Sequence, residues 1–220
     1  MDFKLDKNDI TVIICCAGMG TRLGIGTTKA LVDIEGEPLI IHQLRLLDEF
    51  DDIRVVVGFD AERVINVVKQ FRKDIMFVFN YEYEHNGPAD SVKKALLGAR
   101  EYIITLDGDT IMNPNDFKQF CEYPYECIVV SENASGETIG ADVQNGKVKS
   151  LSKEGGNMQW SGIAKVCKER LYGNSSHMYE ILIPHLPLTA FTMRLKEINT
   201  PKDYEIALDW LATGIETPIL

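Results

Sequence analysis

An apolar strand leads into a glycine-rich loop at Cys15-Cys16-Ala17-Gly18-Met19-Gly20-Thr21-Arg22-Leu23-Gly24. Residues 11–16 form the short apolar run typical of a buried strand. Glycines directly after such a strand let the backbone approach a phosphate and turn its N–H groups toward it. Arg22 can add a forked hydrogen bond to a phosphate, and Lys29 a mobile charge. This stretch therefore predicts a loop that grips a triphosphate.

Two better-known phosphate loops do not fit these residues. The dinucleotide fingerprint Gly-x-Gly-x-x-Gly fails, because Leu23 stands where the third glycine belongs. The Gly-Lys-Ser/Thr end of a Walker loop is absent. A purely structural turn remains as an alternative.

Strands and helices alternate on the C-terminal side of the loop. Such alternation predicts an α/β fold with a Rossmann-like, mostly parallel sheet flanked by helices on both faces, in a single domain over residues 1–220. The expected strands are 11–16, 54–58, 75–79 and 102–106. The expected helices are 39–50, 91–99 and one from an N-cap at Asp60 to Phe71.

The second half of the chain has a less regular pattern. Residues 131–146 are rich in Ser, Asn and Gly and predict turns. In Thr200-Pro201-Lys202-Asp203, a capping hydroxyl, an N1 proline and an N3 carboxylate predict the start of a last helix. The expected strands are 126–131, 147–151, 163–166 and 191–198. An exposed edge at 191–198 would favour a homodimer.

Composition narrows the class of protein. The 220 residues are 45% apolar and 25% charged, and the net charge of −10 argues against a nucleic-acid binder. The charged start at Met1 lacks a signal-peptide core, and no apolar run approaches the roughly 20 residues of a membrane span. The five cysteines have no metal-ligand spacing, so we expect free thiols in a cytoplasmic protein without membrane contact.

Two carboxylates follow the predicted strand 102–106. In an open α/β sheet the carboxyl ends of the strands face the ligand, so Asp107 and Asp109 should face the phosphate loop. Mg²⁺ prefers one or two carboxylates together with substrate phosphates. A solvated Asp-Gly turn is the alternative interpretation.

The signature from Ala17 to Gly24, with Lys29 after it, resembles that of the sugar nucleotidyltransferase superfamily. Thr28 replaces the usual proline, and residues 34–40 resemble the "G-x-P-L-I" lead into the first long helix. The resemblance implies transfer of a nucleoside monophosphate from an NTP to a small phosphorylated acceptor, with Mg²⁺ and release of pyrophosphate. It implies catalytic roles for Arg22 and Lys29. It implies nucleotide contacts at Ala17, Gly18, Met19, Gly20, Thr21 and Asp107.

The same resemblance implies the metal ligands and the base-recognition loop. Asp109 would be the principal ligand, and Asn199, in an ending similar to "D-T-P-E-D-Y", the second. A simple helix start is the alternative for Asn199. Gly87, Pro88 and Ser91 would read the base, although capping alone explains that helix start too. Residues 89–92 also resemble the "A-D-S-V" of methylerythritol-phosphate cytidylyltransferases, which favours CTP.

Acceptor contacts are implied at Lys153, Trp160 and Gly162, with a surface lysine and a core tryptophan as the alternatives. The positions of His85 and His177 in the sequence do not indicate that either acts as a general base. The short chain favours transfer to a phosphoalcohol, phosphonate or sugar phosphate, as in precursor synthesis for cell-surface polysaccharides. The alternatives are a sugar-1-phosphate uridylyl- or guanylyltransferase, a catalytically silent nucleotide-binding regulatory subunit, and a Rossmann oxidoreductase.

Overall fold

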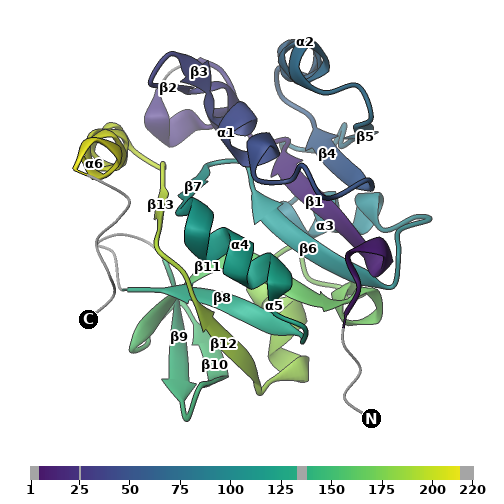
Figure 1. Ribbon diagram of the computed structural model, residues 1–220, viewed down its shortest axis with the longest axis vertical. Coiled ribbons are helices and arrows are strands. Elements are labelled where there is room, and N and C mark those ends of the chain that lie inside the picture. Colours follow the sequence, from purple (N-terminus) through teal and green to yellow (C-terminus); the bar gives the residue numbers. More distant parts are fainter. Residues whose placement is uncertain (1–4, 25, 133–137, 214–220) are drawn as a thin grey trace.

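A mixed β-sheet runs through the centre of the molecule, with helices on both faces (Figure 1). The computed structural model describes residues 5–24, 26–132 and 138–213. Within these residues the sheet has nine strands in the order β5-β4-β1-β6-β11-β8-β12-β10-β9. The strands are β1 Ile10–Cys16, β4 Ile53–Val57, β5 Met76–Phe79, β6 Tyr102–Asp107, β8 Cys127–Ser131, β9 Ile139–Gln144, β10 Lys147–Ser152, β11 Met158–Cys167 and β12 Leu188–Thr192.

The remaining elements surround this sheet. Two small ribbons pair β2 with β3 and β7 with β13. Their strands are β2 Asp33–Ile34, β3 Glu37–Pro38, β7 Thr110–Met112 and β13 Leu195–Glu197. The α-helices are α1 Leu39–Arg45, α2 Ala61–Phe71, α3 Pro88–Ala95, α4 Pro114–Glu122, α5 Met178–Leu182 and α6 Pro201–Ala212. No helix among the described residues is long and apolar enough to cross a membrane.

The first half of the sheet is the parallel α/β unit that the sequence predicts. β1 pairs in parallel with β4 and with β6, and β4 pairs in parallel with β5. The second half is organised around β11, which pairs antiparallel with β6, β8 and β9. The carboxyl ends of β1 and β6 therefore lie side by side, where the register pairs Cys15 with Asp107.

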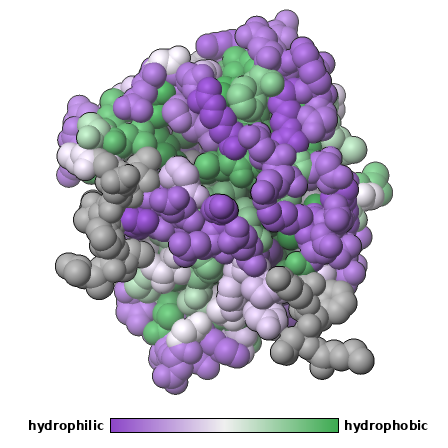
Figure 2. Space-filling model, in the orientation of Figure 1, coloured by the Kyte–Doolittle hydropathy of each residue, from purple (hydrophilic) through white to green (hydrophobic). Residues whose placement is uncertain are grey.

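The two faces of the sheet carry separate apolar cores. Alternate residues of β1 face opposite sides, so Val12 and Ile14 pack against α1, α2 and α4 while Ile13 packs against α3 and α5. A third cluster, which includes Ile198 and Ala207, holds α6 against the segment after the glycine loop. The face over α1 and α4 is largely hydrophilic, with hydrophobic side chains showing between the polar ones (Figure 2).

Buried cations fix the ends of two helices. Arg54 of β4 is 3% exposed and donates to the carbonyls of Ala95, Leu97 and Gly98 at the end of α3. Lys165 of β11 is fully buried and donates to the carbonyl oxygen of Phe120, at the end of α4, at 2.5 Å. Carbonyls at a helix C-terminus have no partner within the helix, so these side chains supply one.

Two helices differ in length from the prediction. α1 ends at Arg45 rather than at residue 50, because the acidic residues that follow are unfavourable at the negative end of a helix dipole. α3 begins at Pro88, a residue suited to the first helical turn, and ends at Ala95 rather than at residue 99. The capping box at the start of α6 is confirmed, with Thr200 accepting from Asp203 N.

Three expectations for the second half are wrong. The predicted turn region 131–146 contains strand β9, while its residues 133–137 lie outside the described residues. The predicted strand 191–198 is divided between β12 and β13, because the chain leaves the sheet at Arg194, which pairs with Asp116 of α4. β12 also lies between β8 and β10, so it is not the edge on which a homodimer was expected.

Candidate active site

The glycine loop folds back over the carboxyl end of β1. Gly20 lies at φ +61°, a left-handed conformation that favours glycine, and begins a short 3-10 helix, Thr21–Leu23. A Cβ at Gly20 would lie 3.1 Å from Lys29 Cγ and 3.1 Å from the carbonyl oxygen of Thr27. The glycine therefore lets Lys29 pass close beneath the loop.

Lys29 joins the two predicted metal ligands. Its Nζ lies 2.6 Å from Asp109 Oδ2 and 2.5 Å from Asn199 Oδ1. Arg22 Nη2 donates to the same Asn199 oxygen at 3.0 Å. The side chains of Lys29 and Asp109 are only 15% and 22% exposed, so this ion pair is partly shielded from water. Four residues predicted from distant parts of the sequence thus meet at one point.

The C-terminal segment reaches this point through the small ribbon of β7 and β13. Glu197 of β13 pairs with Thr110 of β7, directly after Asp109. Ile198 N donates to the carbonyl oxygen of Asp109 at 2.8 Å. The capping box at Thr200 then begins α6 immediately after Asn199. This backbone pairing places Asn199 beside Asp109.

Carboxylates accumulate beneath Lys29. Burial, and secondly the charge of Asp109, raises the pKa of Asp107 to about 7. Burial, followed by the charges of Asp109 and Asp107, raises the pKa of Glu197 to about 8. Burial also raises the pKa of the Cys15 thiol well above its usual value. A further cation beside these carboxyl groups would favour their charged forms and lower their pKa values.

The donor set fits a hard divalent cation. In the part of the chain that the structure describes, no three His, Cys, Asp or Glu side chains form a metal cluster by themselves. Instead, the oxygens of Asp109 and Asn199 converge on a cation, the Lys29 ammonium, as they would on Mg²⁺. Mg²⁺ needs only one or two protein carboxylates when phosphates and water complete its shell. Asp109 and Asn199 could thus hold Mg²⁺ together with a bound triphosphate.

The start of α3 forms the next wall of the site. Gly87, Pro88 and Ser91 line the same cavity as the glycine loop. Ala89 N donates to the carbonyl oxygen of Ser176 at 3.1 Å, so the helix start is already partly satisfied and is not an open anion site. Buried Asn80 donates to Ser91 Oγ at 3.0 Å and to Asn86 Oδ1 at 2.9 Å. The wall is a polar surface suited to the edge of a base.

The predicted acceptor residues line another part of the same cavity. Trp160 is 7% exposed, and its Nε1 donates to the carbonyl oxygen of Ile163 at 3.3 Å, so it packs into the core with one edge on the cavity. Lys153 Nζ lies 5.9 Å from the centre of the Tyr179 ring. Gly162, at φ +77°, touches Asp107, where a Cβ would overlap the carboxylate. This wall offers one cation and two aromatic rings.

A single cavity of about 510 Å³ contains nearly all the predicted site residues. The exception is Met19, whose side chain is 37% exposed and is not part of the lining. The lining includes Ala17, Gly18, Gly20, Thr21, Arg22, Lys29, Gly87, Pro88, Ser91, Asp107, Asp109, Lys153, Trp160, Gly162 and Asn199.

Several lining residues were not predicted. Glu197 is the last residue of β13, and its position two residues before Asn199 is the signal that could have revealed it. Asn80 follows β5 directly, at the ligand-facing edge of the parallel strands. His177 and Tyr179 flank the start of α5, a short helix without a sequence signal. His85 lies outside this cavity.

The model of the MobA-like NTP transferase domain matches residues 12–171, which include the glycine loop, Asp107 and Asp109. The chain belongs to this family. Its domain is a nucleotidyltransferase domain, as the resemblance predicts. Among curated proteins, the bifunctional protein GlmU of Campylobacter hominis is 26% identical over 208 residues, covering 90% of this chain and 44% of that protein. The chain thus spans less than half the length of this relative.

Solved structures share the fold of this MobA-like domain. An inositol-1-phosphate CTP transferase from T. maritima has a TM-score of 0.74 and 16% identity, with 96% of this chain and 98% of that one covered. HddC from Yersinia pseudotuberculosis, complexed with GMP-PN, has a TM-score of 0.72 and 22% identity, with 90% of this chain and 98% of that one covered. Both likenesses confirm the predicted α/β nucleotidyltransferase fold.

Proposed function

We propose that this protein transfers a nucleoside monophosphate from an NTP to a small phosphorylated acceptor and releases pyrophosphate. The observation that carries the proposal is the convergence of Lys29, Asp109 and Asn199 beneath the glycine loop. The loop offers backbone N–H groups for phosphates, and Lys153 adds a third cation to Arg22 and Lys29 in the same cavity. A cavity with several phosphate-binding groups suits two phosphorylated substrates.

The reaction is an in-line attack of an acceptor phosphate oxygen on the α-phosphorus of the NTP. A new oxygen–phosphorus bond forms, the bond between the α-phosphorus and its bridging oxygen breaks, and pyrophosphate leaves. An acceptor phosphate dianion is already nucleophilic, so alignment and charge neutralisation supply most of the catalysis. Gly18, Gly20 and Arg22 hold the β- and γ-phosphates, and Lys29 stabilises the charge on the α-phosphate.

Members of this family typically depend on a divalent metal, and we propose Mg²⁺ with Asp109 and Asn199 as its protein ligands. When bound, Mg²⁺ would neutralise phosphate charge. Lys29 bridges the same two oxygens. With nucleotide bound, we expect the Lys29 ammonium to turn from this position to the α-phosphate, because its stem is flexible.

CTP is the nucleotide that we propose. The start of α3 carries Ala89-Asp90-Ser91-Val92, and the Asn80 amide donates both to Ser91 Oγ and to Asn86 Oδ1. The structurally similar T. maritima protein is itself a CTP transferase, whereas HddC was solved with GMP-PN. UTP or GTP with a sugar 1-phosphate is therefore the second pair to test.

For the acceptor we propose a phosphoalcohol, phosphonate or sugar phosphate, made for a cell-surface polymer in the cytoplasm. Lys153 lines the cavity with its Nζ 5.9 Å from the centre of the Tyr179 ring, and there a cation can meet the acceptor phosphate. Trp160 and Gly162 line the same cavity.

Pyrophosphate release tests this proposal directly. The four NTPs are combined, with Mg²⁺, with phosphocholine, 2-aminoethylphosphonate, sugar 1-phosphates and alditol phosphates. We expect release with CTP and one acceptor class. Release with UTP or GTP and a sugar 1-phosphate would show that one of these nucleotides, and not CTP, is the substrate. Nucleotide binding without release from any pair would favour a silent regulatory subunit.

A further inference from the structure

Asn199 differs from an aspartate in one respect that matters for a cation site. The carboxylate of an aspartate presents two equivalent oxygens, whereas an asparagine presents one oxygen and one NH₂ group. Only the oxygen can face a cation. An asparagine at this position therefore needs something that selects between its two orientations.

The hydrogen bonds around Asn199 show what selects the orientation. On one side, Lys29 Nζ at 2.5 Å and Arg22 Nη2 at 3.0 Å are donors only, and both meet Oδ1. On the other side, Asn199 Nδ2 donates to Glu197 Oε2 at 3.3 Å. Reversing the amide would break all three of these hydrogen bonds and turn the NH₂ group toward two side chains that can only donate.

Glu197 is itself held in place. Its Oε1 accepts from Gln159 Nε2 of β11 at 3.3 Å, and its backbone is paired with Thr110 in the ribbon of β7 and β13. The side chains of Glu197 and Asn199 meet directly after β13, because Asn199 Nδ2 lies 3.3 Å from Glu197 Oε2. Glu197 has no role in the nucleotidyl transfer proposed for Lys29, Asp109 and Asn199.

We propose that Glu197 is a positioning residue that fixes the Asn199 amide with its oxygen toward the cation site. This inference rests on the proposed metal-dependent function. It implies that Glu197 and Asn199 act as a unit in binding the cation. A neutral residue at 197 together with an aspartate at 199 would bind the cation equally well. Aspartate needs no orientation, and the exchange conserves the number of carboxyl groups.

A double-mutant cycle tests the inference. The four proteins are the unaltered chain, Glu197→Ala, Asn199→Asp and the double variant. Mn²⁺ binding to each protein, saturated with α,β-methylene CTP, is measured by water-proton relaxation. A water molecule in the space left by Glu197→Ala both donates and accepts, so it cannot select one amide orientation.

We expect Glu197→Ala to weaken Mn²⁺ binding at least tenfold when residue 199 is asparagine, and less than twofold when it is aspartate. Equal losses in both backgrounds would overturn the inference, because Glu197 would then act directly on the ion or support the fold. No loss in either background would overturn it as well. Lys196→Ala, the neighbouring change on β13, is the matched control and should leave binding unaltered.

Thermal melting and Mn²⁺ binding by the unaltered chain distinguish a failure of folding or of the metal site from a failure of the positioning role. Thermal melting identifies a variant that does not fold, in which case Glu197→Met, closer in volume to glutamate, replaces the alanine in the same cycle. Absence of Mn²⁺ binding by the unaltered chain would overturn the proposed CTP and metal site, and the inference with it. Binding by the unaltered chain with equal losses in the cycle would overturn only the positioning role.

Discussion

Lys29 and Asp109 lie 80 residues apart in the chain, yet Lys29 Nζ and Asp109 Oδ2 are 2.6 Å apart. This ion pair joins the loop after β1 to the end of β6, two neighbouring parallel strands. Asn199 completes the contact from a segment that lies beyond the sheet. The proposed chemistry depends on this meeting of a cation with two oxygen donors.

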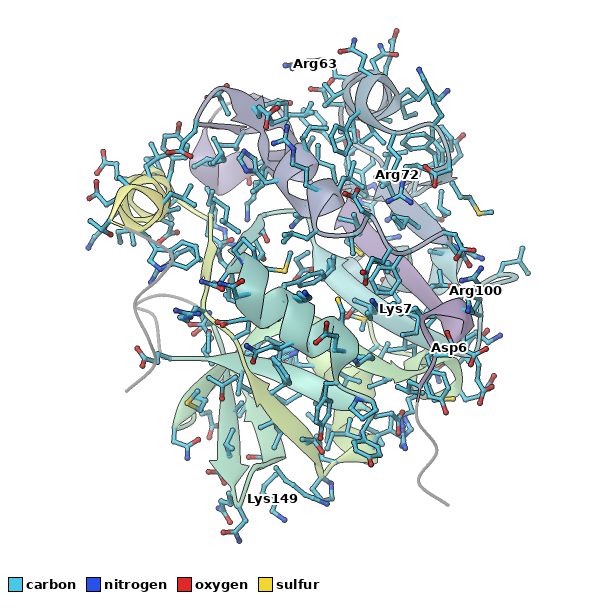
Figure 3. The ribbon with its side chains drawn as sticks, viewed as in Figure 1. Asp6, Lys7, Arg63, Arg72, Arg100 and Lys149 are labelled. Atoms are coloured by element: carbon cyan, nitrogen blue, oxygen red, sulfur yellow. The ribbon has the colours of Figure 1, made fainter. Side chains whose placement is uncertain are left out.

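Lys29→Ala should lower kcat at least about 100-fold, because it removes a fixed positive charge from the α-phosphate in the transition state. Steady-state release of pyrophosphate measures the effect. Lys149→Ala is the control: Lys149 of β10 is exposed at the far end of the molecule, and its removal should leave kcat unaltered (Figure 3). A Lys29→Ala enzyme with a near-normal kcat would remove Lys29 from the mechanism.

Asp109→Asn should abolish the activity that depends on Mg²⁺. The loss should be at least about 100-fold, because several kcal/mol of charge stabilisation depend on the ion. Activity against Mg²⁺ concentration measures it, with Asp209→Asn on the exposed side of α6 as the control. An unaltered Mg²⁺ response in Asp109→Asn would show that this carboxylate is not a ligand.

Gly162→Ala should impair catalysis through Asp107. The added Cβ would overlap the Asp107 carboxylate, which lies at the floor of the cavity. Gly146→Ala is a matched control, since Gly146 has a similar φ of +70° but no atom within 4 Å of an added Cβ. Both changes should cost about 1 kcal/mol of stability from backbone strain. Only Gly162→Ala should lower kcat, by at least about tenfold, because it displaces the Asp107 carboxylate. Equal kcat values in the two variants would show that the contact between residue 162 and Asp107 does not matter for catalysis.

Asp116→Asn should destabilise the protein in a pH-dependent way. Arg194 donates to Asp116 through its backbone and its guanidinium, and this hydrogen bonding holds the pKa of Asp116 below its usual value. A lowered folded-state pKa stabilises the fold above the unfolded pKa of about 4, and the benefit is lost as the pH falls toward the folded-state value. We expect a loss of about 2 kcal/mol at pH 7.

Urea unfolding at pH 7 and at pH 3 measures that difference, which should shrink at the lower pH. Asp74→Asn is the control, because Asp74 pairs with Arg72 at the surface with its side chain 53% exposed. Exposed pairs contribute about 1 kcal/mol or less. A deficit in Asp116→Asn that stays constant with pH would mean that the charge of Asp116 is not responsible.

The parallel half of the fold could be predicted because its strands are short apolar runs, and β1, β4 and β6 are buried along almost their whole length. Residues 102–106 and the carboxylates after them therefore identified one edge of the site. β9 was missed because its residues follow a segment rich in Ser, Asn and Gly, and its strand is stabilised by pairing with β10 and β11 rather than by a local pattern. The division of β12 from β13 depends on the contact of Arg194 with Asp116, which has no sequence signal.

The candidate site could be predicted only in part. The position of Asn199 beside Asp109 follows from the pairing of β13 with β7, a long-range contact that only the family resemblance implied. The His177–Tyr179 wall depends on a five-residue helix, too short to show periodicity. Trp160 could not be assigned to core or site, because it belongs to both.

The most direct test of the central claim follows a label from the NTP. The protein is incubated with Mg²⁺ and acceptor, and with CTP labelled either at the α-phosphorus or at the γ-phosphorus. We expect the α-label to enter the acceptor product and the γ-label to leave as pyrophosphate, with both signals lost in Lys29→Ala. Transfer of the γ-label to the acceptor, or release of orthophosphate alone, would contradict nucleotidyl transfer at this site.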